Sequence, residues 1–136
     1  MTAVTHSAPA PGKATKIAGW TLTGLFTAFM LFDAGIKLAR LPIVDQTGAE
    51  LGLPPGSGFA IGVMEAVLLA LYLLPRTSVL GAVLFTGLFG GTMAVHLLAG
   101  NPLFSHLLFG VYLAVFAWGG LWLRDARLRE LFPLRR

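Results

Sequence analysis

Apolar residues run through this chain in four long stretches, and short segments rich in polar residues, proline or glycine separate them. The stretches cover residues 17–38, 57–74, 78–99 and 103–123. A helix needs about 20 residues to cross a hydrocarbon core that is about 30 Å thick. Each stretch is therefore predicted to be one transmembrane helix. The expected fold is all-α, an antiparallel four-helix bundle embedded in a membrane.

Proline and glycine mark the ends of the predicted spans. Pro75 ends the second span because it cannot continue a helix, and the turn at 75–77 is so short that the second and third spans must be antiparallel neighbours. The tripeptide at 100–102, Gly-Asn-Pro, separates the third span from the fourth. Residues 41–58 are predicted to form a loop.

The two ends of the chain differ from the spans. Residues 1–16 are small and polar, with several prolines, and are predicted to be a disordered tail. Residues 124–136 alternate charged residues with Leu and Phe, which is typical of an amphipathic helix lying on a membrane surface.

The composition agrees with a membrane protein. Of 136 residues, 56% are hydrophobic and 12% are charged, and the mean hydropathy is +0.78, whereas soluble domains are about 45–50% apolar. The four spans leave no room for a separate soluble domain, and the expected surroundings are a lipid bilayer, not nucleic acid. Because the chain has no cysteine, it has no disulfide and no thiolate chemistry. A redox role would need a bound cofactor or a partner protein.

The positions of Lys and Arg predict the orientation. Most of the ten bases lie in the tails and in the 75–77 turn: Lys13, Lys16, Arg76, Arg124, Arg127, Arg129, Arg135 and Arg136. Basic segments stay on the cytoplasmic side of a membrane. Both termini are therefore predicted to be cytoplasmic, and the 41–58 loop and the 99–102 turn are predicted to face outward.

Ionisable residues lie at similar depth in all four predicted spans. Asp33 and Lys37 are four residues apart, which places them on one helix face in the order that favours pairing. Glu65 lies near the outer end of the second span, and His96 and His106 flank the outer turn. Charges at membrane depth usually face the interior of a bundle or a wet cavity. These five residues are the predicted polar cluster.

Structural explanations exist for most of this cluster. Asp33 and Lys37 can form an ion pair that fixes helix register, and each histidine can cap a helix or meet water. A haem held by the two histidines is possible in geometry but is only weakly indicated, and no metal site is predicted. Glu65 has no partner in its own span, and an intramembrane carboxylate is a functional-site hypothesis by default. Tyr72 lies about two turns deeper on the Glu65 face and could extend a polar track.

Several short segments together resemble one known family. They are GIKL at 35–38, LGLP at 51–54, IGVME at 61–65, LPR at 74–76, Gly90-Gly91 followed by His96-Leu97, and WLRD at 122–125. In this order and spacing they resemble the DoxX-like family of small four-helix bacterial membrane proteins, over about residues 17–133. The resemblance implies a multi-pass protein of the bacterial cytoplasmic membrane. Some relatives are small subunits of thiosulfate:quinone oxidoreductases or work with membrane redox partners.

Two functions from different classes follow. In the first, the protein is a small membrane subunit or accessory factor of redox metabolism, at most a subunit of an oxidoreductase. The residues that would bind a quinone head group or relay its protons are Lys37, Glu65, His96, His106 and Tyr72. In the second, the protein is a non-catalytic scaffold or assembly factor, with a partner protein or a second copy of itself. A proton-coupled carrier of small solutes is disfavoured, because four helices without visible inverted repeats leave little to move.

Overall fold

The structure, a computed structural model, describes residues 9–132, and all the regular secondary structure in this part of the chain is helical. Its elements are α1 (Lys13–Leu38), α2 (Pro42–Glu50), α3 (Ser57–Leu73), α4 (Ser78–Leu98), η1 (Leu103–Leu107), α5 (Phe109–Arg124) and α6 (Ala126–Leu131).

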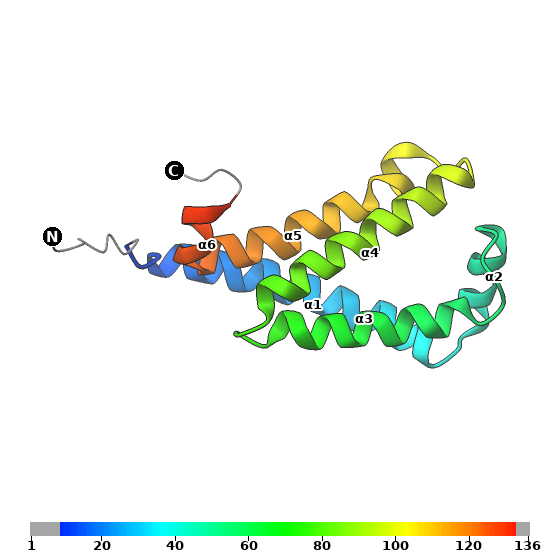
Figure 1. The fold of residues 1–136 in the computed structure, drawn as a ribbon, viewed down its shortest axis with the longest axis horizontal. Coiled ribbons are helices and arrows are strands. Elements are labelled where there is room, and N and C mark those ends of the chain that lie inside the picture. The colour runs from blue at the N-terminus through cyan, green and yellow to red at the C-terminus, as the bar shows by residue number, and fades with distance from the viewer. Residues whose placement is uncertain (1–8, 133–136) are drawn as a thin grey trace, which may run out of the picture.

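The long helices lie side by side. α1 packs against α3 and α5, and α4 packs against the same two helices from the other side. Figure 1 shows the start of α1 and all of α6 at one end of the molecule, and α2 at the opposite end. α2 packs on α3, and η1 packs on α4 and α5.

Aromatic rings fill the centre of the molecule. The ring of Phe26 on α1 meets Tyr72 of α3 and Phe85 of α4 edge to face, with 5.1 Å between centroids in both pairs. Phe85 and Phe89 stack at 5.5 Å. Edge-to-face and offset-stacked rings are the favoured arrangements of aromatic side chains. The core is therefore built by contacts that cross from α1 to both α3 and α4.

Large apolar side chains also cover the outside. Leu31 and Phe32 of α1 are 60% and 66% exposed, although both lie in the middle of an apolar stretch. Among the described helices, three are long and apolar enough to cross a membrane, namely α1, α4 and the combined stretch Leu103–Arg124, while α3 is apolar but shorter. An apolar exterior on helices of this length identifies a multi-pass membrane protein.

The structure differs from the predicted boundaries in three places. α1 begins at Lys13, so the last four residues of the predicted disordered tail are helical. The first part of the predicted 41–58 loop forms α2, with Pro42 in its first turn, where a fixed φ and a missing N–H favour helix initiation. The fourth span begins with one turn of π-helix, η1, before α5. Residues 1–8 and 133–136 of the predicted tails lie outside the described residues.

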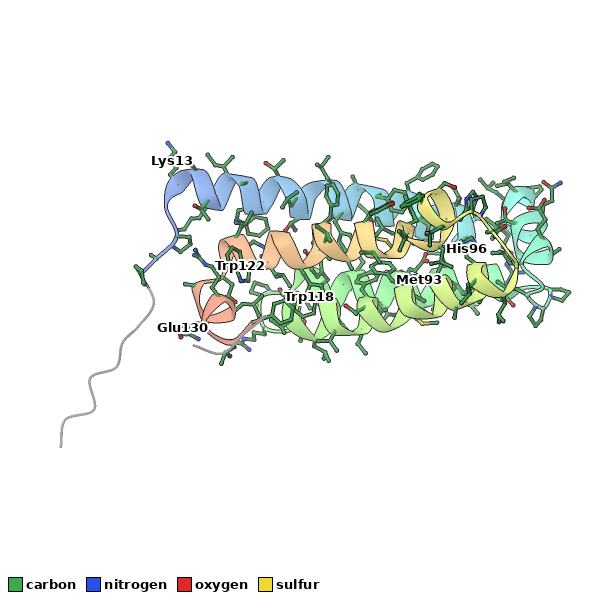
Figure 2. The ribbon with its side chains drawn as sticks, turned by 90° about the horizontal axis from the view of Figure 1, so that it is seen from above. Lys13, Met93, His96, Trp118, Trp122 and Glu130 are labelled. Carbon is green, nitrogen blue, oxygen red and sulfur yellow. The ribbon has the colours of Figure 1, made fainter. Side chains whose placement is uncertain are left out.

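The segment after α5 folds back onto the bundle. α6 has six residues, and Asp125 caps its first turn by accepting from the backbone N–H groups of Arg127 and Leu128. Trp122 donates from Nε1 to the carbonyl of Phe132 at 3.0 Å, and the ring of Phe132 stacks on Trp118 at 4.8 Å. The described part of the predicted amphipathic segment, up to Phe132, is therefore attached to the end of the bundle at Trp118 and Trp122, which Figure 2 labels.

Candidate functional site

Lys37 lies at the centre of a three-residue ionic cluster. Its Nζ lies 2.6 Å from Oδ2 of Asp33, one turn earlier on α1, and 2.6 Å from Oε1 of Glu65 on α3. We call these three residues the Lys37 cluster. Glu65 has no partner in its own span, and the structure brings Lys37 of α1 to its Oε1 atom.

The close approach of α1 and α3 makes this contact possible. Gly62 lies one turn before Glu65, and a Cβ at Gly62 would stand 2.7 Å from the Cβ of Lys37. Because glycine has no Cβ, the aliphatic part of the Lys37 side chain lies against the α3 backbone, and its ammonium group reaches Glu65. Small residues at helix interfaces allow such approach in membranes. Gly62 is the residue of this site that the sequence analysis missed, although it shares the helix face of Glu65.

Burial in the Lys37 cluster increases from Asp33 to Glu65. The exposed fraction of the side chain is 27% for Asp33, 19% for Lys37 and 5% for Glu65. Removing an ion from water costs several kcal/mol, about 20 kcal/mol in the idealised limit, and a well-placed counter-ion offsets that cost. Because Glu65 is the most buried member, it depends most on Lys37.

One atom of the Lys37 cluster is not satisfied within residues 9–132. Glu65 Oε2 is buried, and no hydrogen-bond partner for it is found in that part of the chain. Two carboxylates and one ammonium also carry one negative charge in excess when all are ionised. The arrangement can therefore take up a proton at Glu65, or accept a hydrogen bond from a bound hydroxyl group.

The two histidines form a separate pair. The rings of His96 and His106 meet at 5.6 Å between centroids. The Nδ1 atom of His96 lies 2.8 Å from Asn101 Nδ2, and that of His106 lies 2.8 Å from Ser105 Oγ. Within the described residues, no hydrogen bond or ion pair connects this pair to the Lys37 cluster. The five predicted residues thus fall into two groups, and Figure 2 shows His96 of the second group at the end of the molecule opposite α6.

Tyr72 has a structural contact of its own. Its hydroxyl donates to the backbone carbonyl of Ala117 on α5 at 2.7 Å, and the side chain is fully buried. This hydrogen bond ties α3 to α5 across the core. The hydroxyl proton is therefore used within the fold, and the extension of a polar track from Glu65 to Tyr72 stays a prediction.

A metal ion and a haem are the other ligands considered from the sequence. Among residues 9–132, no group of three or more His, Cys, Asp or Glu side chains is placed to hold a metal ion. His96 and His106 are the residues that would hold a haem, and their rings contact each other.

The helices and the Lys37 cluster define a multi-pass helical membrane protein with a buried ionic site between two of its helices. The family model described as the DoxX-like family matches residues 21–120, which include the Lys37 cluster and both histidines. The chain belongs to the DoxX-like family. Comparisons with the curated proteins and with the solved structures gave no match.

Proposed function

We propose that this DoxX-like protein is a small membrane subunit or accessory factor of quinone-linked redox metabolism, and that the Lys37 cluster is its polar site. The observation that carries the proposal is Glu65 Oε2, a buried carboxylate oxygen beside a lysine and without a partner in the described residues. A buried acceptor of this kind calls for an explanation, and a ligand that donates a hydrogen bond is one.

The chemistry of the cluster fits a quinone head group. An ammonium has three N–H donors, and Lys37 uses two of them on Asp33 and Glu65. The third N–H of Lys37 can donate to a carbonyl oxygen of the oxidised quinone. When the quinone is reduced, Glu65 Oε2 can accept a hydrogen bond from its hydroxyl group. A bound quinone supplies the electron chemistry, and the protein residues hold the head group and exchange its protons. Carboxylates are suited to such exchange because they change protonation state readily.

The proposed setting is the bacterial cytoplasmic membrane, with residues 17–123 forming an antiparallel four-helix domain and with both termini in the cytoplasm. The distribution of bases supports this orientation. The order of helices in Figure 1 agrees with it, since α6 and the start of α1 share one end. In this orientation the Lys37 cluster lies in the outer half of the membrane, beneath α2.

The direct test is to measure quinone retained by the purified protein. Lipids are extracted from protein in mild detergent, and quinone is quantified by chromatography for the wild type, Glu65→Gln and Glu50→Gln. The control makes the same change in an exposed carboxylate of α2. We expect the wild type and Glu50→Gln to retain quinone, and Glu65→Gln to lose most of it while remaining folded.

A second candidate function is a scaffold or assembly factor. It is favoured by the fact that Lys37 already pairs with both carboxylates, so the cluster can act only as a lock between α1 and α3. A wild-type protein that retains no quinone, together with full activity of Glu65→Gln in the cell, would favour the scaffold over the quinone site. A partner oxidoreductase or a second copy of the chain would then be the binding partner to identify.

A further inference from the structure

The end of the molecule opposite the Lys37 cluster carries a cavity whose lining includes two arginines and two carboxylates. It measures about 750 Å³ and lies where the segment before α1, the turn between α3 and α4, and the α5–α6 junction meet. Its lining includes Arg124 and Arg127 together with apolar residues of four segments: Ala10, Pro11, Pro75, Val79, Leu121, Ala126 and Leu131. Ser78, Asp125 and Glu130 also line it. We call this space the end cavity.

The acidic residues of the end cavity have partners. Asp125 accepts from the backbone of Arg127 and Leu128 and so caps α6. Glu130 also makes an interaction of its own. Among the described residues, no ion pair joins Asp125 to Arg124 or to Arg127.

Guanidinium nitrogens of Arg124, which lines the end cavity, and of Arg129, which does not line it, are buried without partners among residues 9–132. Arg124 Nε, and Nε and Nη2 of Arg129, have no hydrogen-bond partner among residues 9–132 although they are closed to solvent. The Arg124 guanidinium lies 4.3 Å from the centre of the Trp20 ring, and that of Arg129 lies 5.7 Å from that of Trp122. Rings therefore hold both cations in place by cation–π contact. A buried donor that lacks a partner calls for an explanation, and a bound acceptor is one.

A second hollow adjoins the end cavity and shares Pro11 with it. It measures about 630 Å³ and is lined by Pro11, Lys13, Lys16, Ile17, Trp20 and Thr21. Ile17 and Trp20 are each 57% exposed along the outside of α1. The hollow is thus apolar along α1, and Lys13 and Lys16 line it near the start of the helix.

We propose that these two spaces bind one anionic phospholipid. Arg124 and Arg127 hold the headgroup phosphate in the end cavity, and one acyl chain follows Ile17 and Trp20 along α1. Guanidinium groups bind phosphate by paired N–H donors, and basic pockets between helices on the cytoplasmic side of a membrane recognise anionic headgroups. This inference is independent of the proposed quinone site, which lies at the other end of the molecule.

The test compares lipids of equal chain length by native mass spectrometry of the purified protein. Phosphatidylglycerol is titrated against phosphatidylcholine for the wild type, Arg127→Gln, Arg124→Gln/Arg127→Gln and Arg76→Gln. Arg76 is the matched control, because it is an exposed base at the same end that does not line the cavity. We expect the wild type to prefer phosphatidylglycerol. The preference should fall about fivefold in Arg127→Gln and about 25-fold in the double variant, and it should persist in Arg76→Gln.

Three results would overturn the proposal. They are equal binding of phosphatidylcholine, an equal loss in Arg76→Gln, and displacement of the lipid by millimolar inorganic phosphate. The first two would indicate a general surface charge, and the third a site for the free anion. If the double variant does not fold, the exposed Arg127→Gln variant still decides, since an unchanged lipid preference there contradicts the proposal.

Discussion

Gly62 of α3 lies directly against Lys37 of α1. A Cβ added at Gly62 would stand 2.7 Å from the Lys37 Cβ and 3.3 Å from the backbone nitrogen of Leu38. The missing side chain therefore sets the distance between the two helices at the level of the Lys37 cluster. The ion pair between Lys37 and Glu65 depends on that distance, because Glu65 follows Gly62 by one helical turn.

Gly62→Ala is expected to push α3 away from α1 and to lower the free energy of unfolding by about 1–3 kcal/mol, as overpacking does. The measurement is thermal unfolding in detergent. Gly24→Ala is the control, because a Cβ at that position of α1 meets nothing within 4 Å, and alanine is favoured over glycine inside a helix. Equal stability of the two variants would show that α1 and α3 do not approach each other closely at Gly62.

Lys37→Met is expected to destabilise the protein by about 3–5 kcal/mol, because it leaves a buried carboxylate without its counter-ion. Asp33→Leu/Lys37→Met should not recover this loss, since Glu65 remains unpaired. Lys37→Met/Glu65→Gln should recover part of it, because both buried charges of the contact are then gone. Unfolding in detergent measures all three. An identical loss in Lys37→Met and in Lys37→Met/Glu65→Gln would mean that the two residues are not coupled.

The sequence was sufficient to predict the apolar helices and the pairing of neighbours on one helix, since both depend on local spacing. The separation of Asp33 and Lys37 by four residues is such a local signal. The sequence could not predict which residue would contact Glu65, because that contact depends on the rotation of α3 about its axis and on the small size of Gly62. The same limit applies to the histidines, which share a depth with Glu65 in the sequence but pair with each other in space.

Tyr72→Phe is expected to lower stability by about 1–2 kcal/mol, because the variant keeps the ring packing and loses the hydrogen bond to Ala117. Tyr112→Phe is the matched control. Its hydroxyl also donates to a backbone carbonyl, that of Phe104 at 2.9 Å, but the site is exposed, so a smaller loss is expected. Quinone retention should not change in Tyr72→Phe, and a specific loss of quinone there would instead place Tyr72 in the binding site.

Cysteine labelling tests the proposed orientation. The chain has no cysteine of its own, so only the introduced residue of this protein can react. Gln46→Cys on α2 should react with a membrane-impermeant thiol reagent on intact cells. Gly12→Cys, just before α1, should react only after the membrane is opened. Both positions are exposed. The reverse pattern would place the Lys37 cluster in the cytoplasmic half of the membrane.

The short length of α3 has a consequence for the surrounding lipid. α3 has 17 residues and α4 has 21, so at 1.5 Å per residue they are about 26 Å and 32 Å long. In the proposed four-span arrangement, a bilayer that matches α4 is too thick for α3, and local thinning on the α3 side relieves the mismatch. Thinning brings headgroups and water toward Glu65, which lies six residues after Phe59, about 9 Å along the helix. The acyl chain length of the membrane thus becomes a control on the hydration of this carboxylate, and shorter chains favour its access to protons.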